Sequence, residues 1–351
     1  MKIVLIIVAA VALGITGFLS QKSFGKLPSG ERKERVERSP FWKDGVFENE
    51  TPAFMNTGDE GFLKLAWKFL SEKKTSRLEP EEGEITVVRS DLKSLPADKD
   101  CFVWFGHSSF LLHLSGKNIL VDPVFYECGP APFGSKAFKG TDVYRPADMP
   151  DTIDYLVISH DHWDHLDYKT AREMKDRIGK VLCPLGIGED FEYWGFPAGK
   201  LLELDCNEDA SHADFIFRCL PTRHFSGRGL KRMRTQRASW LIEAPSRKVF
   251  YTGDGGFSER FARFGQTFPD IDLAIMENGQ YDGKWSQIHT MPEELGRELK
   301  DLRPARFVTV HHSKYALANH DWDEPLRNEQ VAAEESGIPL IVKQIGEIVW
   351  L

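Results

Sequence analysis

The sequence has little cysteine, and what it has is dispersed. The five cysteines among 351 residues are Cys101, Cys128, Cys183, Cys206 and Cys219. No two of them form a close pair such as Cys-x-x-Cys, so the sequence predicts neither a disulfide framework nor a cysteine-based zinc site. We expect buried free thiols instead.

The sequence also lacks a surplus of basic residues. Its 53 acidic and 45 basic side chains give a formal net charge of −8, whereas proteins that bind nucleic acids are normally basic. With 41% hydrophobic and 12% aromatic residues, the chain can bury a core large enough for one large domain or two modest ones. We therefore expect a globular protein without a nucleic acid partner.

Long hydrophobic runs are absent after the first 21 residues. Residues 3–19 are apolar or small and uncharged, which is close to the lower limit for crossing a bilayer. No small-x-small cleavage pattern follows, so segment 1–21 is predicted to be an uncleaved membrane anchor rather than a cleaved signal peptide. The basic residues between Lys22 and Arg38 favour a cytoplasmic body. A periplasmic or exported location is the alternative.

The remainder of the chain divides into two parts. Residues 22–95 are polar and poor in strand patterns, and we interpret them as an N-terminal extension with a short amphipathic helix at 62–70. Residues 96–351 alternate apolar strands with helices, which indicates a layered α/β domain. Strands are predicted at 101–105, 109–114, 118–121, 155–159, 215–220, 238–243, 248–252, 273–276, 306–310, 339–342 and 347–351. Helices are predicted at 168–178, 290–302 and 324–336.

Side chains that can bind metals crowd into one tight turn of this domain. His160, His162, Asp164 and His165 lie within six residues, directly after the apolar run 155–158. Imidazoles held this close repel one another when protonated, and burying them without a partner is costly. A divalent cation removes both problems, because neutral imidazole nitrogen and carboxylate oxygen are good zinc ligands. The turn therefore predicts a metal site.

Further candidate ligands share one placement along the chain. His224, Asp254, and the pair His311 and His312 each follow the end of a predicted apolar strand. Adjacent strands would deliver all of them to one edge of a sheet. A single histidine in such a place would be weak evidence for a metal site. The repeated placement predicts that these side chains converge with the 160–165 turn.

The number of candidate ligands supports two metals. The candidates divide into two sets and a bridge: His160, His162 and His224; Asp164, His165 and His311; and Asp254. Between metals roughly 3.5–4 Å apart, a bridging water loses a proton near neutral pH and becomes a nucleophile. Asp254 is thus predicted to be catalytic as well as a ligand. We expect two zinc ions, although manganese and iron accept the same ligands.

These residues resemble the metallo-β-lactamase superfamily. The turn His160-x-His162-x-Asp164-His165, with a later histidine, aspartate and histidine, has the superfamily pattern. Within it, residues 96–351 are similar to N-acyl-phosphatidylethanolamine-hydrolysing phospholipase D and its bacterial relatives. The matching stretches are 104–107, 120–123, 158–168, 183–186, 220–224, 251–254 and 315–319.

The resemblance implies an α/β fold, an αββα sandwich with a dinuclear zinc centre at the sheet-edge loops. It favours His311 over His312 as a ligand. It also gives His289 the role of stabilising charge on the phosphate or protonating the leaving oxygen. His107 and Asp122 are implied to lie beside the ligands or the substrate, and Asp122 to orient a ligand imidazole.

A basic loop after His224 bears on the choice of substrate. Arg228, Lys231 and Arg232 are predicted to hold a phosphate or to face anionic lipid headgroups. Together with the predicted anchor, this loop favours a phospholipid substrate and a phosphodiesterase of phospholipase D type.

Other functions remain open at this stage. A sugar-phosphate lactonase, of the ascorbate-6-phosphate lactonase kind, would use the same metals on a carbonyl group. The acidic net charge disfavours a nuclease. A non-catalytic, membrane-bound metal-binding protein would need no open coordination position. The oligomeric state is undetermined, with a homodimer as one alternative.

Overall fold

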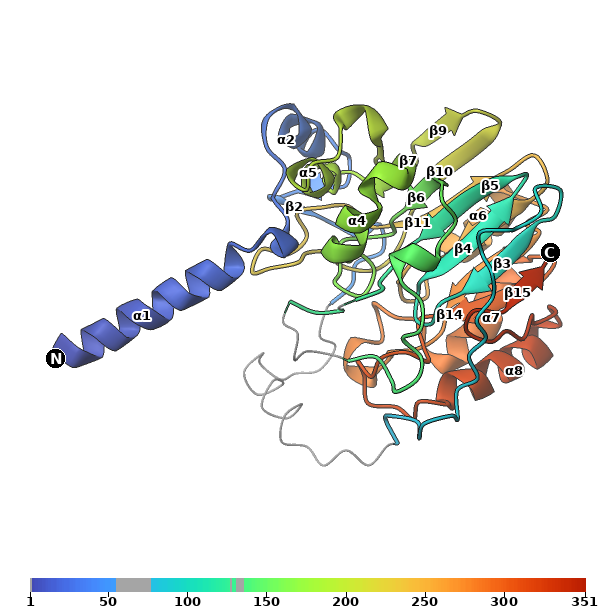
Figure 1. Ribbon diagram of the computed structural model, residues 1–351. Helices are drawn as coiled ribbons and strands as arrows, with labels where there is room; N and C mark the ends of the chain where they lie inside the picture. The colour runs from blue at the N-terminus through green and yellow to red at the C-terminus, as the bar shows by residue number, and fades with distance from the viewer. Residues whose placement is uncertain (1, 55–76, 127, 131–135) are drawn as a thin grey trace.

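Two mixed β-sheets form the centre of the molecule (Figure 1). The computed structural model describes residues 2–54, 77–126, 128–130 and 136–351. Seven strands form the first sheet, in the order β15-β3-β4-β5-β6-β7-β8, and six form the second, in the order β14-β13-β12-β11-β10-β9. The strands of the first sheet are β3 (Cys101–Trp104), β4 (Phe110–Leu114), β5 (Lys117–Val121), β6 (Ile153–Val157), β7 (Ile178–Pro184), β8 (Leu201–Leu204) and β15 (Ile348–Trp350). Those of the second are β9 (Asp209–His212), β10 (Phe215–Pro221), β11 (Ala238–Glu243), β12 (Lys248–Tyr251), β13 (Leu273–Glu277) and β14 (Phe307–Val310).

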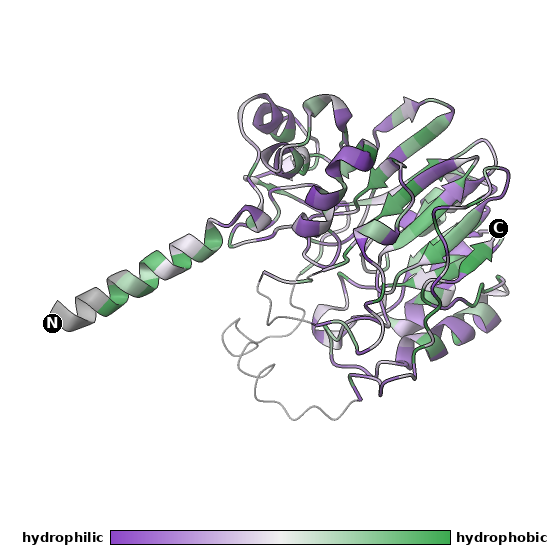
Figure 2. Ribbon diagram, viewed as in Figure 1, coloured by the Kyte–Doolittle hydropathy of each residue, from purple (hydrophilic) through white to green (hydrophobic). Residues whose placement is uncertain are grey.

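The two sheets pack face to face, and their alternating side chains explain the packing. In β3, Phe102 and Trp104 point into the core between the sheets, whereas Cys101 and Val103 face a second core outside the first sheet. Strands that are covered on both faces become apolar throughout, and all four of these β3 residues are buried. Figure 2 shows this hydrophobic colouring along the central strands.

Helices cover the outer face of each sheet. Residues of α4 (Tyr168–Met174) and α5 (Gly188–Tyr193) share the outer core of the first sheet. The outer core of the second sheet contains residues of α6 (Arg260–Thr267), α7 (Pro292–Leu302) and α8 (Glu324–Ser336). The αββα sandwich that the sequence resemblance implied is confirmed.

The part of residues 22–95 that the structure describes contacts both sides of the domain, since Glu50 pairs with Arg263 of α6 on the second sheet's side. It contains η1 (Lys22–Phe24), α2 (Gly30–Glu37) and the short pair β1 (Trp42–Lys43) and β2 (Val46–Phe47). Arg32 of α2 binds Glu189 of α5 and Glu203 of β8, at 3.0 and 2.8 Å. This stretch is therefore attached to the sandwich by ion pairs. The predicted helix at 62–70 lies outside the described residues.

The N-terminal helix α1 (Lys2–Leu19) projects from the body of the molecule (Figure 1). Its apolar side chains include the exposed Ile7, Val11 and Leu13. Within the described residues, none of the helices has the length and apolar character that crossing a membrane requires. The membrane-spanning anchor predicted from the sequence is thus not supported.

The element boundaries differ from the predicted ones in three places. The helix predicted at 168–178 ends at Met174, and Gly179 lies within β7, because the chain turns through η3 (Lys175–Arg177) directly into that strand. The helix predicted to begin at Thr290 begins at Pro292 and is capped by Glu294. The strand predicted at 339–342 is reduced to one bridge between Leu340 and Phe307.

The other three-residue helices are η2 (Pro146–Asp148), η4 (Ala198–Lys200) and η5 (Gly283–Trp285). All five cysteines are buried free thiols, as expected.

Replacing Phe217 with alanine should strongly destabilise the sandwich. Phe217 of β10 is fully buried between the sheets and contacts Tyr155 of β6, with the ring centroids 4.8 Å apart. Loss of a buried phenyl ring costs about 3–5 kcal/mol of unfolding free energy, which urea denaturation would measure. Phe54→Ala is the control, because Phe54 is 70% exposed, and it should change the stability by about 0.5 kcal/mol or less. Equal shifts for both variants would contradict the two-sheet core.

Candidate metal centre

The predicted ligands lie at one edge of the sandwich because the strands that precede them run in the same direction. β5 and β6 are parallel, as are β12, β13 and β14. β10 pairs antiparallel with β11, which pairs antiparallel with β12, so β10 and β12 also point the same way. The loops that follow β6, β10, β12 and β14 therefore meet at a common edge.

Three histidines from two of these loops form the first group. His160 and His162 follow β6, and His224 follows β10. The Nδ1 atom of His162 lies 2.8 Å from Nε2 of His160 and 3.2 Å from Nε2 of His224. Side-chain nitrogens of all three lie close enough to hold one metal ion. This is the first ligand set predicted from the sequence.

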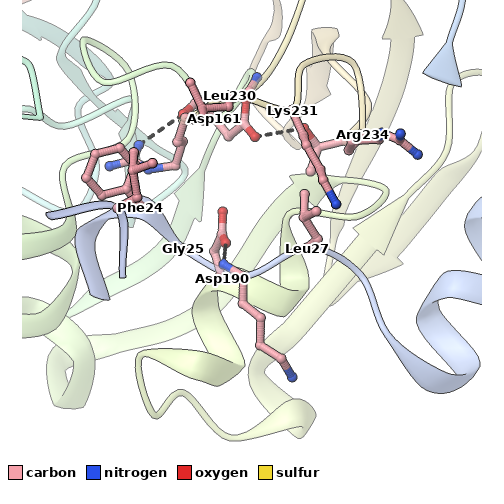
Figure 3. A pocket seen from close by; sticks show the side chains of 14 residues that line it. Phe24, Gly25, Leu27, Asp161, Asp190, Leu230, Lys231 and Arg234 are labelled. Carbon is pink, nitrogen blue, oxygen red and sulfur yellow. Dashed lines mark hydrogen bonds between the residues drawn. The ribbon is translucent and has the colours of Figure 1, made fainter. Parts of the chain in front are cut away.

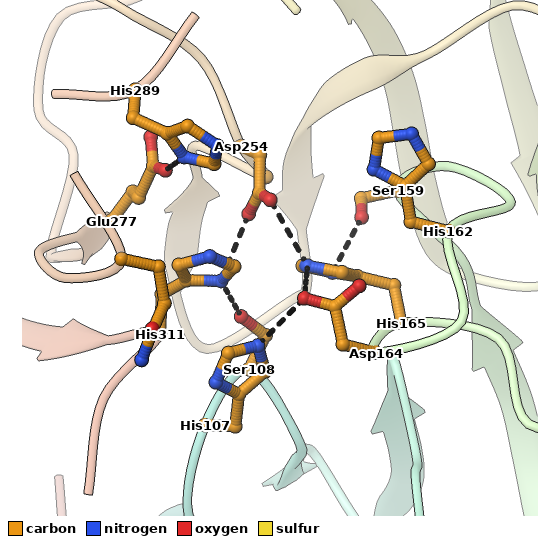
Figure 4. Close-up of polar contacts among 12 residues, drawn as sticks. His107, Ser108, Ser159, His162, Asp164, His165, Asp254, Glu277, His289 and His311 are labelled. Atoms are coloured by element: carbon orange, nitrogen blue, oxygen red, sulfur yellow. Dashed lines mark hydrogen bonds and ion pairs between the residues drawn. The ribbon is translucent and has the colours of Figure 1, made fainter. Parts of the chain in front are cut away.

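The second group contains the second predicted set and one more histidine. Asp164, His165, His311 and His107 have potential ligand atoms within 4.8 Å of one another. Oδ2 of Asp164 lies 3.6 Å from Nε2 of His165 and 2.9 Å from Nε2 of His107. Figure 4 shows these side chains turned toward a common space. His107 belongs to this cluster, where the sequence placed it only nearby.

Asp254 lies between the two groups. Its Oδ2 atom is 3.7 and 3.8 Å from Nε2 of His224 and His160, which belong to the first group. The same oxygen is 3.1 Å from Nε2 of His165, and Oδ1 is 3.2 Å from Nδ1 of His311. The carboxylate thus reaches both groups, as the bridging role requires.

Several buried polar atoms in the cluster are better suited to binding a metal ion than to hydrogen bonding with one another. Among the described residues, Nδ1 of His107, Nε2 of His162, Nε2 of His165 and Oδ1 of Asp254 are buried without a hydrogen-bond partner. Such atoms are costly to bury unless a ligand or ion satisfies them. Their chemistry, imidazole nitrogen with carboxylate oxygen, is that of a zinc site.

The protonation states of four predicted ligands also suit metal binding, whereas, although burial opposes it, nearby carboxylates raise the pKa of His165. Burial, together with neighbouring imidazoles, lowers the pKa of His160, His224 and His311 well below the usual value. Burial likewise lowers the pKa of His162 to about 3. These imidazoles are therefore neutral near pH 7, which is the form that binds a metal.

Asp122 holds one ligand in place. This carboxylate follows β5 and accepts hydrogen bonds from the backbone N–H of Ser159, at 2.8 Å, and from the hydroxyl of Tyr251, at 2.7 Å. It also lies 2.8 Å from Nδ1 of His165. An Nδ1 proton shared with Asp122 leaves Nε2 of His165 as the nitrogen for a metal, and it fixes the orientation of the ring.

The backbone at this edge adopts conformations that most residues avoid. His107, Asp122 and His311 have φ angles of 51°, 40° and 74°, and such left-handed residues concentrate at functional sites. Gly253 has a φ of 58°, and a Cβ atom there would lie 2.5 Å from the carbonyl oxygen of Ala238. The loop that carries Asp254 thus needs glycine at this position.

A further acidic side chain reaches the site from β13. Glu277 binds Nδ1 of His289 through Oε1 and accepts hydrogen bonds from the backbone of Gly255 and Thr290 through Oε2. Although burial opposes it, the Glu277 carboxylate raises the pKa of His289 above its usual value. Together with Asp254 and His311, these two residues form another group with metal-ligand spacing.

Sequence reasoning did not identify Glu277 or the supporting residues Tyr251, Ser159 and Ser108. Ser108 lies 2.9 Å from Nδ1 of His311 through its hydroxyl. Glu277 ends β13, so the placement rule that found the later ligands applies to it as well. For the tyrosine and the two serines the sequence carries no comparable signal.

The remaining predicted residues lie in different environments. His312 is turned away from the cluster, with Nδ1 2.7 Å from the hydroxyl of Ser313, and it belongs to none of the described metal-spaced groups. Arg228 is buried on the far side of the 160–165 turn. Lys231 is exposed and lines a separate cavity. Arg232 lies over the ring of Phe225, which contacts His162.

Comparisons with known proteins agree with this geometry. The model of the Beta-lactamase superfamily domain matches residues 117–312. An uncharacterized protein of Mycobacterium tuberculosis is 34% identical over 317 residues, covering 89% of this chain and 84% of that protein. The N-acyl-phosphatidylethanolamine-hydrolyzing phospholipase D 1 of Caenorhabditis elegans is 26% identical over 307 residues, covering 81% and 85%. The metallo hydrolase Igni18 of Ignicoccus hospitalis has a similar fold, with a TM-score of 0.55 and 20% identity over 72% of this chain and 98% of that one.

Asp122→Asn should weaken metal binding without unfolding the chain. The amide NH₂ cannot accept the hydrogen bonds that the carboxylate accepts, so the His165 ring loses its fixed orientation. Loss of such a partner typically lowers metal affinity about 10- to 100-fold, which competition with a chromophoric chelator would measure. Asp176→Asn is the matched control, because its side chain is 95% exposed. Equal affinity in the two variants would refute the role of Asp122.

Proposed function

The chain belongs to the beta-lactamase superfamily of metal-dependent hydrolases, and on that basis we propose that it is a phosphodiesterase of phospholipase D type. Its proposed substrates resemble N-acyl-phosphatidylethanolamine. The observation that carries the proposal is the position of Asp254, which reaches both ligand groups and shares a third group with His289. The similarity to the nematode phospholipase over 81% of this chain supports the choice of substrate.

We propose that the two predicted ligand sets hold two zinc ions, with Asp254 between them. When bound, such ions polarise a phosphoryl oxygen and lower the pKa of water, so that a nucleophile is present at neutral pH. The orphaned atoms of His162, His165 and Asp254 support this assignment. The same donors accept manganese or iron.

His289 is proposed to give a proton to the leaving alcohol oxygen. Glu277 engages Nδ1 of the ring, which leaves Nε2 as the nitrogen that can serve the substrate. The ring centroid of His289 lies 4.9 Å from that of His224 and 5.5 Å from that of His311. A donor beside both ligand groups is placed to stabilise the oxygen as its bond to phosphorus breaks.

Recognition of the lipid is proposed to involve the basic loop and the N-terminal helix. The guanidinium of Arg232 lies over the ring of Phe225, and that ring contacts His162. Guanidinium groups bind phosphate well. The exposed apolar residues of α1 support contact with a lipid surface.

A panel of substrates tests the proposed reaction. The metal-loaded protein should release phosphatidic acid from N-acyl-phosphatidylethanolamine, because hydrolysis breaks the bond between phosphorus and the headgroup oxygen. Mass spectrometry of the products would measure this release. Asp254→Ala should lose the activity and also hydrolysis of bis(p-nitrophenyl) phosphate, while keeping the circular dichroism spectrum of the wild type.

Two outcomes would contradict the proposal. Ring opening of sugar-phosphate lactones without release of phosphatidic acid would identify a lactonase in place of a phospholipase. Undiminished turnover by metal-depleted Asp254→Ala protein would refute the metal-dependent mechanism altogether.

The proposed role of His289 predicts that the defect depends on the leaving group. His289→Ala should reduce kcat about 100-fold or more for an alkyl phosphodiester, which needs a proton on its poor leaving group. The reduction should be much smaller for bis(p-nitrophenyl) phosphate, whose leaving group departs as a stable anion. Steady-state kinetics on both substrates would measure the difference.

Glu277→Gln should follow the same pattern, because it removes the charge that holds His289. His212→Ala is the control, since His212 lies on β9 and belongs to none of the described metal-spaced groups. Equal loss of kcat on both substrates would show that His289 does not donate the proton.

A further inference from the structure

A cavity of about 320 Å³ lies between the N-terminal segment and the loop that follows His224 (Figure 3). This volume is within the ~300–1,000 Å³ range of small-molecule sites. Its apolar lining comes from Leu19, Phe24, Leu27 and Leu230. The last of these is 85% exposed, so folding does not explain why a large hydrophobic side chain stands there.

The polar end of the cavity contains a buried cation with an unused donor. Arg228 donates to the carbonyl oxygens of Ser23, Asp161 and Leu166, at 2.9, 2.9 and 2.6 Å. Its guanidinium lies 4.0 Å from the centre of the Trp163 ring. Within the part of the chain that the structure describes, Nη2 of Arg228 has no hydrogen-bond partner. A buried guanidinium that binds only neutral oxygens is incompletely satisfied.

The carboxylates that line the cavity are already engaged. Asp161 accepts from the backbone N–H of Gly227, at 2.6 Å, and from the hydroxyl of Thr235, at 2.7 Å. Asp190 accepts from the backbone N–H of Lys26, at 2.6 Å, and burial raises its pKa to about 8. Burial and the neighbouring Asp161 thus favour the uncharged form of Asp190, while the carboxylates of Asp190, Asp161 and Asp167 favour the charged form of Arg228.

Other cations surround the same space. Lys26, Lys231 and Arg234 line the cavity together with Arg228. Lys26 is paired with Glu189, and Lys231 is exposed. The cavity therefore combines an apolar wall with basic side chains, which is the complement of a molecule that has a hydrocarbon chain and a negatively charged head.

We propose that this cavity is a binding site for an anionic amphiphile, an alkyl carboxylate or alkyl phosphate. The negative head meets Arg228 and Lys231, and the chain lies against Leu19, Phe24 and Leu230. This site goes beyond the proposed hydrolysis, because it lies behind the metal-binding turn rather than at the ligands. It stands whether or not the phospholipase assignment is correct.

The site is physically coupled to the metal centre through the same turn. Arg228 donates to the carbonyl oxygens of Asp161 and Leu166. Asp161 lies between two predicted ligands of the 160–165 turn, and Leu166 directly follows the turn. Phe24 stacks edge-on against Trp163, with the ring centroids 5.0 Å apart. We infer that an anion bound beside the Arg228 guanidinium acts on this turn through the same hydrogen bonds.

Isothermal titration calorimetry on the metal-loaded full chain tests the proposal. Decyl phosphate and decanoate, below their micelle concentrations, should bind with one molecule per chain. The tighter of the two identifies the head group as phosphate or carboxylate. Decanol and inorganic phosphate should each bind at least about tenfold more weakly, because each lacks one half of the recognised structure.

Variants of exposed residues separate this site from adsorption to α1 or to the metals. Lys231→Ala should weaken binding about tenfold through loss of a charge-assisted hydrogen bond, and Leu230→Ser should also weaken it. Lys300→Ala is the matched control, an exposed lysine on α7, and should bind like the wild type. Unchanged affinity in both Lys231→Ala and Leu230→Ser, or equal affinity for decanol, would overturn the proposal.

Discussion

The structure depends on the burial of many imidazoles and carboxylates at one edge of a β-sandwich. Packing alone does not stabilise such a cluster, because each of these groups loses water and several of their atoms have no hydrogen-bond partner among the described residues. The fold tolerates the cluster because parallel strand ends place opposite charges and neutral imidazoles side by side. A divalent cation between them would satisfy the orphaned atoms, so stability and metal binding share one cause.

Much of this edge could be predicted from the sequence, since ligands that follow strand ends form a local pattern. His160, His224 and Asp254 were found in this way, and the structure brings them together; their role as ligands stays a prediction. Glu277 also follows the end of a predicted apolar strand but was not identified as a candidate. By contrast, β7, β8 and β9 were missed, because lysine, glutamate and aspartate interrupt their apolar residues. In β8, for example, Glu203 pairs with Arg32 of the distant helix α2.

The roles of the basic residues could not be predicted, because they depend on packing between distant segments. Arg228 was predicted to hold a phosphate near the metals because it follows His224 by four residues. Its guanidinium is buried against Trp163 and reaches Ser23, about two hundred residues earlier in the chain. No local sequence pattern shows whether an arginine in this loop points toward the predicted metal ligands or toward the opposite side of the 160–165 turn. Only the docking of the N-terminal segment decides this.

The same docking bears on specificity. The predicted metal ligands fall within residues 117–312, the part that matches the superfamily model, so we infer that they are shared by relatives with different substrates. Residues that can distinguish one hydrolase from another must then lie outside that set or in its loops. Phe18, Phe24 and Trp163 form a continuous aromatic contact from α1 to the metal-binding turn. The N-terminal segment therefore contacts the turn that carries four of the predicted ligands, and we propose that it influences substrate choice through this contact.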